Sequence, residues 1–339
     1  MLRAGIVGLG WWGGTLVDAV QASDAVRFTA AATRRRSEAD QAFARERGLK
    51  LYSYEDMVAD PEVDAVVLAT PPAGHLQQIA AAAAAGKHVF CEKPFAMTKA
   101  DAQGAVDAVD KAGVTLGLGY NRRFHPSWID LKNRIRAGEL GTILHLECTM
   151  SGPNALSMSG EAWRAQADQA PCGGLFPMGV HAVDGFIDLV GGIDHVFAQS
   201  FRRANPNPND DTTTILFRMK EGMSAYLGTM TATAGSFRMQ VYGSKGMALL
   251  AGAVHIAGQS SHQRRAGLFG SYLIQPIKGD AREIEVPEFD VNRAELEAFA
   301  AAVAGEAPYP ISHEQMIHAV AATDAIIASA RSGRPETVA

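Results

Sequence analysis

The sequence of 339 residues predicts an α/β protein with two domains, each built around its own sheet. In roughly the first 120 residues, strand-like and helix-like segments alternate, which is typical of a doubly wound parallel sheet with helices on both faces. From residue 194 to 286, strand-like segments follow one another without helices, which favours a mostly antiparallel sheet. We therefore expect one domain over residues 1–121 and a second over residues 122–339.

The alternation in the first domain is regular enough to place its elements. Short apolar segments are predicted to be strands at 3–8, 27–32, 49–52, 64–69, 88–91 and 115–119. Helical patterns are predicted between them at 12–22, 37–47, 74–85 and 98–112. Strands joined by right-handed crossovers in this way form the dinucleotide-binding fold, whose ligands bind at the carboxyl ends of the strands.

A glycine-rich turn follows the first strand. Gly8, Gly10 and Gly13 have G-x-G-x-x-G spacing, and Trp11 and Trp12 stand between the last two glycines. In such a turn the first glycine permits the tight bend, the second lets the backbone approach a pyrophosphate, and the third lets the helix pack on the strand. The helix N-terminus adds N–H groups that attract phosphates. We predict a dinucleotide site that includes these five residues; the alternative is a glycine-rich turn of another α/β protein.

The end of the second strand indicates which dinucleotide binds. Thr33 stands 20 residues after Gly13, where an NAD site usually has a carboxylate for the ribose 2′-hydroxyl, and Arg34 and Arg35 follow it. A carboxylate would repel a 2′-phosphate, whereas arginines bind one. We therefore expect NADP as the cofactor, with NAD as the second choice, and contacts from Thr33 and both arginines. The alternative is a solvated loop that does not select between the two.

Two further strand ends are candidates for the same site. The fourth strand ends in Thr70 and Pro71, which shape a wall beside the cofactor, and His75 follows on a helix. His75 would face the ribose or phosphates, or else lie on the helix surface. The fifth strand ends in Glu92 and Lys93. Lys93 is placed to hydrogen-bond a reacting hydroxyl or carbonyl; the alternative is a structural pair with Glu92.

The bulk composition excludes several classes of protein. A net charge of −5, with one short basic cluster at 34–36, argues against a nucleic-acid or membrane surface. The three cysteines are odd in number and lack C-x-x-C spacing, which fits a reduced compartment. The histidines lack metal-ligand spacing. We expect a cytoplasmic protein that binds no metal.

The second domain contains a long irregular segment, 151–176, which leads directly to His181. Segments of this length are often functional, so we expect it to frame the substrate pocket. Within it, Arg164 follows Trp163 and could bind a carboxylate or phosphate as a planar fork; the alternative is a surface arginine beside a buried anchor. The other predicted elements are a helix at 126–137, strands at 142–150, 196–201, 212–219, 224–231, 237–242 and 247–250, a mobile loop at 255–280, and helices at 292–303 and 312–331.

Motifs along nearly the whole chain carry a family likeness. They are GLGWWG from Gly8, Thr70-Pro71-Pro72 with His75, Glu92-Lys93-Pro94, Gly119-Tyr120-Asn121-Arg122-Arg123-Phe124, and Gly173-Gly174 with Gly179-Val180-His181 and Asp184. On these motifs the chain resembles the Gfo/Idh/MocA family, named after glucose–fructose oxidoreductase, inositol dehydrogenase and MocA. The resemblance implies an NAD(P)-dependent oxidoreductase with a Rossmann domain over 1–121. It also implies a substrate-binding domain over 122–339, whose large open sheet joins subunits into homodimers or homotetramers.

The resemblance also implies roles for particular residues. Lys93 would lie by the nicotinamide and the substrate, and His181 would act in proton transfer. Asn121 would belong to the cofactor site. The substrate site would include Arg123, together with Trp163, Arg164 and His181.

One position departs from the common pattern of the family. Many members have an Asp four residues before the motif histidine, and here Pro177 stands in its place. Proline neither accepts nor donates a proton, so the expected chemistry depends on Lys93 and His181. Asp184, one turn after His181, is expected to stabilise the start of its helix through the dipole, or else to act on His181.

The expected reaction is reversible hydride transfer between nicotinamide C4 of NADP and a secondary alcohol or ketone of a sugar, inositol or related cyclic polyol. Pro177, Arg123 and Arg164 leave room for an acidic cyclic dihydrodiol as the substrate instead. A non-catalytic NADP-binding sensor is another alternative. A third is an enzyme that retains its cofactor tightly and alternately oxidises and reduces sugars.

Overall fold

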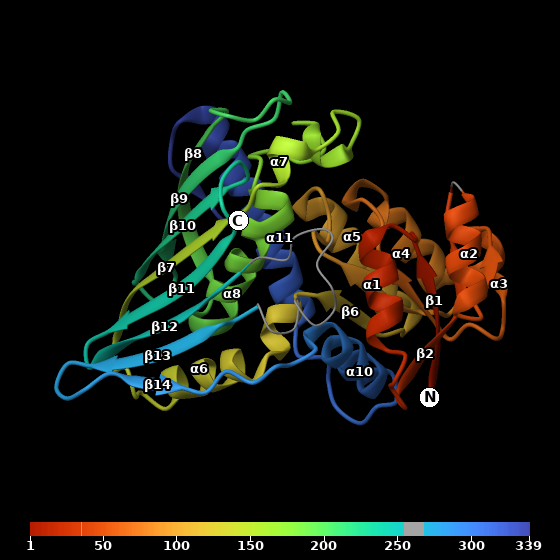
Figure 1. Ribbon diagram of the computed structural model, residues 1–339, viewed down its shortest axis with the longest axis horizontal. Helices are drawn as coiled ribbons and strands as arrows, with labels where there is room; N and C mark the ends of the chain where they lie inside the picture. Colours follow the sequence, from red (N-terminus) through yellow and green to blue (C-terminus); the bar gives the residue numbers. More distant parts are fainter. Residues whose placement is uncertain (35, 254–267) are drawn as a thin grey trace. The chain divides into compact units, whose positions relative to one another are not determined.

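The computed structural model describes residues 1–34, 36–253 and 268–339, and it divides the chain into two compact units (Figure 1). The first unit comprises Met1–Asn121 and Asp290–Val320, and the second comprises Arg122–Phe289 and Ala321–Ala339. A boundary therefore falls between residues 121 and 122, and a later stretch of the chain returns to the first unit.

The first unit contains a parallel sheet of six strands in the order β3-β2-β1-β4-β5-β6. The strands are β1 (Leu2–Val7), β2 (Val26–Ala32), β3 (Lys50–Tyr52), β4 (Ala65–Leu68), β5 (His88–Glu92) and β6 (Leu116–Gly119). All of their pairings are parallel. The order reverses between β1 and β4, as in a doubly wound dinucleotide-binding fold, which confirms the predicted fold class.

Helices complete the first unit. They are α1 (Trp11–Ala19), α2 (Glu38–Glu46), α3 (Tyr54–Ala59), α4 (His75–Ala84), α5 (Lys99–Ala112), α10 (Val291–Val303) and the start of α11 (His313–Ser332). α10 covers the sheet through Phe299, whose ring lies 5.6 Å from that of Phe90 on β5. Gly117 on β6 leaves space for this contact, because a Cβ there would lie 2.9 Å from both rings. Packing across the sheet therefore ties α10 to the first unit.

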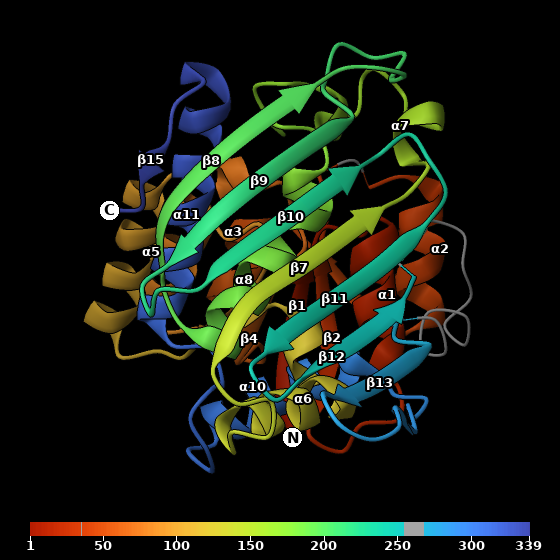
Figure 2. The ribbon, with the colours of Figure 1, turned by 90° about the vertical axis from the view of Figure 1, so that its left-hand side faces the viewer.

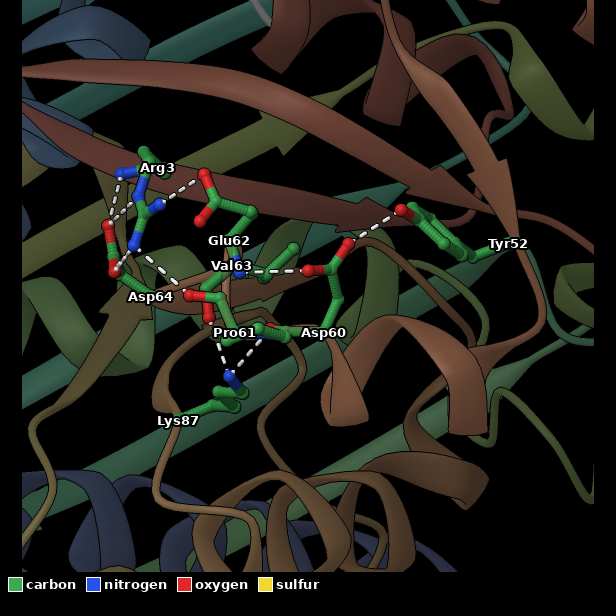
Figure 3. Close-up of polar contacts among 8 residues, drawn as sticks. All are labelled: Arg3, Tyr52, Asp60, Pro61, Glu62, Val63, Asp64 and Lys87. Carbon is green, nitrogen blue, oxygen red and sulfur yellow. Dashed lines mark hydrogen bonds and ion pairs between the residues drawn. The ribbon is translucent and has the colours of Figure 1, made fainter.

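A polar cluster fastens the amino ends of the strands (Figure 3). Arg3 on β1 donates from its backbone N–H and from Nε to Asp64, each at 2.9 Å. Lys87, just before β5, donates from Nζ to the backbone carbonyls of Asp60 and Val63, each at 2.8 Å. These bonds hold the loop before β4 at the edge of the sheet opposite the glycine turn, so the cluster is structural.

The second unit contains a nine-stranded sheet in the order β14-β13-β12-β11-β7-β10-β9-β8-β15 (Figure 2). The strands are β7 (Ile143–Ser151), β8 (Ile193–Phe201), β9 (Thr212–Met219), β10 (Ser224–Met230), β11 (Ser236–Gly243), β12 (Gly246–Gly252), β13 (Ser271–Pro276), β14 (Arg282–Ile284) and β15 (Glu336–Thr337). β7 and β10 pair in parallel and the other pairs are antiparallel, as expected. The loop expected at 255–280 is wrong for Ser271–Pro276, which forms β13; residues 254–267 lie outside the described part of the chain.

Helix α8 (Val180–Val190) carries the candidate catalytic histidine of the second unit and packs on one face of its sheet. Phe186 on α8 lies 5.5 Å from Phe217 on β9, ring centre to ring centre. Gly185 lets Trp128 of α6 (Pro126–Arg136) approach, because a Cβ there would lie 2.8 Å from the indole. The remaining helices of this unit are α6 (Pro126–Arg136), α7 (Asn154–Ser157) and the end of α11.

In the described residues, no helix combines the length and apolar character that a membrane span requires.

Candidate active site

The three glycines of the first turn meet three different steric demands. Gly8 has a φ of +95°, and a Cβ there would lie 2.8 Å from the carbonyl oxygen of Ala69. A Cβ at Gly13 would lie 1.9 Å from the carbonyl oxygen of Gly8, so only glycine lets α1 pack this close to the turn. At Gly10, a Cβ would meet no described atom within 4 Å. The turn is thus tight on the protein side and open at Gly10, which fits a pyrophosphate.

The first turn of α1 presents aromatic rings beside its backbone N–H groups. Gly10 is the N-cap and has no side chain with which to cap the helix. Trp11 is 46% exposed, and its ring centre lies 5.4 Å from that of Trp12. The Trp12 indole lies near the carboxyl group of Glu92, at the end of β5, and acts to lower the pKa of that carboxyl. The helix end therefore presents N–H groups to a ligand and is linked to the Glu92-Lys93 motif.

At the end of β2, Thr33 is half-buried and Arg34 is exposed, while Arg35 lies outside the described residues. A carboxylate does lie near this strand end, since Asp40 Oδ2 is 3.5 Å from the Thr33 hydroxyl. The same oxygen accepts the Ser37 N–H at 3.0 Å in the capping box of α2. Donors from the protein therefore already engage this carboxylate.

His75 differs from both expectations, because its ring is fully buried. Nε2 lies 2.9 Å from the carbonyl oxygen of Thr70, and Nδ1 lies 3.0 Å from that of Phe95. Cys91 Sγ is 3.1 Å from the same Nδ1. Burial lowers the pKa of His75, which favours the neutral ring. In place of a cofactor contact, we assign His75 the role of joining the backbone after β4, at Thr70, to the backbone after the Glu92-Lys93 motif, at Phe95.

Thr70 and Pro71 stand next to the glycine turn. The Thr70 methyl group would lie 3.4 Å from a Cβ on Gly8, and its hydroxyl donates to Gln78 Oε1 at 2.6 Å. Pro71 is exposed and precedes a short 3₁₀ helix (Pro72–Gly74) that leads into α4. These positions agree with a wall beside the open side of the turn.

Glu92 ends β5 and Lys93 follows it, with a cis peptide bond between Lys93 and Pro94. The Lys93 backbone N–H donates to Glu92 Oε2 at 3.2 Å. Burial raises the pKa of Glu92 to about 7, against the opposing effect of the Lys93 charge. Asn121, at the start of a 3₁₀ turn (Asn121–Phe124), is also buried and donates to Asn292 Oδ1 of α10 at 2.9 Å.

In the second unit, His181 occupies the first turn of α8 and is 8% exposed. A π-helical turn, Leu175–Gly179, leads into it and contains Pro177. The N–H groups of Met178 and Gly179 both donate to the carbonyl of Gly174, at 3.1 and 3.0 Å. Because proline has no N–H, the ladder of this turn begins only after Pro177, and wide turns of this kind are often found at functional sites.

Arg123 lies in a buried charge cluster and not on a surface that a substrate reaches. Its Nε donates to Asp184 Oδ2, and one terminal nitrogen donates to Asp188 Oδ1, each at 2.9 Å. Asp188 also accepts from the Trp128 indole at 2.9 Å and pairs with Lys132. We therefore assign Arg123 a structural role in place of the expected substrate contact. Asp184 likewise serves this cluster and not the helix dipole, and burial raises its pKa to about 6.

Trp163 and Arg164 form a short 3₁₀ turn (Trp163–Ala165) in the segment before α8. The Arg164 guanidinium carbon lies 4.4 Å from the centre of the Trp163 ring, a cation–π contact. Asn209 donates from Nδ2 to the backbone carbonyls of Arg164 and Ala170, at 3.0 and 2.9 Å. The loop before α8 is thus fastened through its backbone, while the Arg164 side chain is exposed.

The other arginine of the motif, Arg122, has different surroundings. It is 7% exposed, and its guanidinium carbon lies 5.2 Å from the centre of the Phe237 ring. Its Nε finds no hydrogen-bond acceptor among the described residues. Burial lowers the pKa of the Arg122 guanidinium to about 10. A negatively charged Cys148 thiolate would act in the opposite direction and raise that pKa. Because burial raises the pKa of Cys148 to about 12, that thiol is neutral and is not a counter-ion.

Three buried residues near the motifs were not predicted, namely Arg122, Asp188 and Glu295. Glu295 gives a signal in the sequence, because it lies four residues from Val291 and from Phe299, on the apolar stripe of α10. Asp188 stands one turn after another acid in an otherwise apolar helix. A charge on an apolar stripe is a reason to expect a buried partner.

The fold and the turn define the class of protein. A Rossmann unit with an open glycine turn, followed by a second α/β unit, is the architecture of an NAD(P)-dependent oxidoreductase. Residues 2–120 match the family described as an oxidoreductase family with an NAD-binding Rossmann fold, and residues 128–249 match the GFO/IDH/MocA C-terminal domain. The chain belongs to the Gfo/Idh/MocA family of oxidoreductases, which confirms the resemblance stated from the motifs.

The relatives of this chain include dehydrogenases. The chain is 32% identical to the rhizopine catabolism protein MocA of Rhizobium meliloti over 254 residues, which cover 73% of this chain and 77% of MocA. It is 28% identical to the myo-inositol 2-dehydrogenase of Thermotoga maritima over 256 residues, or 72% and 74% of the two chains. A match to YrbE of Bacillus subtilis, an uncharacterized oxidoreductase, is 32% identical over 203 residues and spans 58% of this chain and 57% of that protein.

The fold is shared with solved structures at lower identity. The levoglucosan dehydrogenase complex with NADH and levoglucosan superposes with a TM-score of 0.85, at 21% identity over 99% of each chain.

Proposed function

We propose that this oxidoreductase transfers hydride reversibly between NADP and a secondary alcohol or ketone of a sugar, inositol or related cyclic polyol. The observation that carries the proposal is the glycine turn, which is closed to a side chain at Gly8 and Gly13 and open at Gly10. The names of the relatives, which include a myo-inositol dehydrogenase and a levoglucosan dehydrogenase, support the class of substrate. Titration of the purified protein with NADPH, followed by a screen of cyclic polyols and their ketones, tests it.

A nicotinamide supplies the hydride chemistry when it is bound. The residues of the chain bind the cofactor, orient the substrate and move the proton. The N–H groups at the start of α1 would hold the pyrophosphate. We assign proton exchange with the substrate oxygen to His181, and hydrogen bonding to that oxygen to Lys93. Thr70, Pro71 and Asn121 would complete the cofactor site.

The preference for NADP rests on Arg34 and on the absence of an acid at Thr33. Replacing Arg34 with alanine removes a charged hydrogen-bond donor for the 2′-phosphate. We expect the Kd of NADPH to rise about tenfold, while that of NADH changes little. Quenching of tryptophan fluorescence measures both, since Trp11 and Trp12 lie in the turn. Arg27→Ala is the matched control, because Arg27 is an exposed arginine at the amino end of the same strand. Equal weakening of both cofactors, or tighter binding of NADH by the native chain, would contradict the preference.

A second candidate substrate, an acidic cyclic dihydrodiol, is favoured by Arg122. A buried guanidinium with no described carboxylate beside it is costly unless an anion joins it. A substrate carboxylate would supply that anion, and the Phe237 face would pack against the apolar edge of its ring.

Turnover of a carboxylated ring and of its neutral analogue tests this candidate. We expect Arg122→Gln to raise the KM of the carboxylated substrate by about 10- to 100-fold and to change that of the neutral one little. Arg164→Gln is the control, since Arg164 is an exposed arginine of the same unit. If only Arg164→Gln discriminates between the two substrates, Arg122 is not the carboxylate site.

We also propose that the chain works in the cytoplasm as a homodimer or homotetramer through its nine-stranded sheet. Leu216 and Phe201 are more than half exposed. The pairings of β8 and β9 place them on one face of the sheet, while Phe217 on the other face packs against α8. An open, partly apolar sheet face supports association between copies. Sedimentation equilibrium of the purified chain measures its mass, and a monomer at micromolar concentration would exclude the assembly.

A further inference from the structure

Two buried carboxyl groups of the first unit have no part in the proposed mechanism. Glu92, at the end of β5, is 3% exposed, and Glu295, on α10, is fully buried. α10 packs against both β5 and β6. An acid with so little access to water needs either a cation or a hydrogen-bond donor for each oxygen.

The structure makes room for the Glu92 carboxyl group. Glu92 pairs with Gly119 on β6, and a Cβ on Gly119 would lie 2.8 Å from Glu92 Cδ and Oε1. The carboxyl group therefore lies over the neighbouring strand, in space that any other residue at 119 would fill. The Lys93 backbone N–H donates to its Oε2.

Three oxygens of these two acids are left without a donor. Glu92 Oε1 and both carboxyl oxygens of Glu295 are buried and have no hydrogen-bond partner among the described residues. An ionised carboxylate only accepts hydrogen bonds, so two ionised acids cannot satisfy each other. A protonated acid carries its own O–H donor.

The charges around Glu295 lead to the same conclusion. Three neighbouring charged groups act on the pKa of Glu295. Lys93 is a cation, whereas Glu92 and Asp290 are acids. Burial raises the pKa of Glu92 to about 7, and burial together with the Glu92 charge raises the pKa of Glu295 well above its usual range. Like charges held in a low dielectric do not both ionise, and such a pair titrates as a unit.

We propose that Glu92 and Glu295 hold one proton between them at neutral pH, and that Glu295 is a positioning residue for Lys93. The shared proton supplies a missing donor and leaves a single negative charge to balance the Lys93 ammonium. Loss of that proton at higher pH places a second negative charge near Lys93. No electrons move in this step. The effect on Lys93 rests on the proposed function, whereas the shared proton does not.

The pH dependence of stability tests the shared proton without any turnover. Between the usual glutamate pKa of 4.5 and about 7, the folded chain keeps a proton that the unfolded chain releases. The stability that the folded chain gains from this proton is therefore complete below pH 4.5 and is lost as the pH rises through 7. For this pair, the folding equilibrium constant falls by up to tenfold per pH unit in that window. Glu295→Gln keeps the shape of the side chain but cannot ionise. The fall of the folding equilibrium constant with pH should therefore be less steep in this variant.

Glu297→Gln is the matched control on the same helix, since Glu297 has a partly exposed carboxylate paired with Arg293. It should keep the native slope in denaturant titrations across pH 5 to 8. Infrared spectra of the native chain provide a second measurement that needs no variant. They should show the band of a protonated carboxylic acid at pH 7, and Glu92→Gln or Glu295→Gln should remove it. An unchanged slope in Glu295→Gln, or no such band in the native chain, overturns the shared proton.

The role toward Lys93 is tested by the pH profile of kcat. In the native chain at high pH, the second negative charge holds the proton on Lys93, so Glu295→Gln should move the alkaline limb of the profile to lower pH, while Glu297→Gln leaves it in place. An alkaline limb that does not move, together with loss of the infrared band, limits Glu295 to a structural role and overturns positioning. A chain that loses the band and turns over no cyclic alcohol or ketone would refute the proposed function while leaving the shared proton standing.

Discussion

Lys93→Met lowers kcat by roughly 10²- to 10⁴-fold, the usual contribution of a group that handles the proton of the reacting oxygen. His181→Ala has an effect of the same order, and in both variants the Kd of NADPH changes far less than kcat. The physical reason is that a cofactor held by the backbone of a glycine turn does not need either side chain, whereas the proton does. Steady-state kinetics with the best cyclic alcohol of a screen, combined with fluorescence titration, measure the two effects separately.

Lys87→Met is the matched control for Lys93→Met. Both lysines flank β5, one at its amino end and one at its carboxyl end. Lys87 is bonded to the backbone carbonyls of Asp60 and Val63, so its loss affects stability and not the reaction (Figure 3). If Lys93 and His181 act in one step, the double variant is no slower than the worse single variant. Full activity in both single variants would show that the catalytic roles are misassigned.

Asp188→Ala destabilises the second unit by about 3–5 kcal/mol, the range observed when one partner of a buried ion pair is removed. Asp188 has 1% of its side chain exposed and serves Arg123, Lys132 and the Trp128 indole at once. Without it, Asp184 is left to balance two cations, and the indole N–H loses its acceptor. Urea denaturation followed by circular dichroism measures the loss in the free energy of unfolding.

Glu147→Ala is the comparison for Asp188→Ala. Glu147 pairs with Arg238 at 3.0 Å on neighbouring strands of the same sheet, but both side chains are partly exposed. Surface pairs of this kind contribute about 0–1 kcal/mol. A similar small loss in both variants would mean that the buried cluster stabilises the fold no more than a surface pair does.

The parts that local patterns determine were predictable from the sequence. The glycine spacing, the alternation of strands and helices and the apolar periodicity predicted the parallel sheet and most of the antiparallel one. The short β14 and β15 were not predicted, because two or three residues carry too little periodicity. β13 was missed for a different reason, since its polar flanks favoured a loop.

The charge partners could not be predicted in the same way. Arg123 meets Asp184 across 61 positions of sequence, and nothing in either motif specifies that distant contact. The neighbouring Arg122 looks equivalent in the sequence, yet its side chain packs on Phe237 without a described carboxylate beside it. Tertiary packing decides which of two adjacent arginines forms an ion pair, and the local sequence pattern does not predict it.

The return of α10 to the first unit also bears on how the protein is made. A ribosome delivers Phe90 and Gly117 long before Phe299, the residue that covers them. The nascent Rossmann sheet therefore emerges with an apolar face that stays uncovered while β7 to β14 of the second sheet are translated. The first unit is therefore completed only after most of the second sheet has been made, in an order different from that of the sequence.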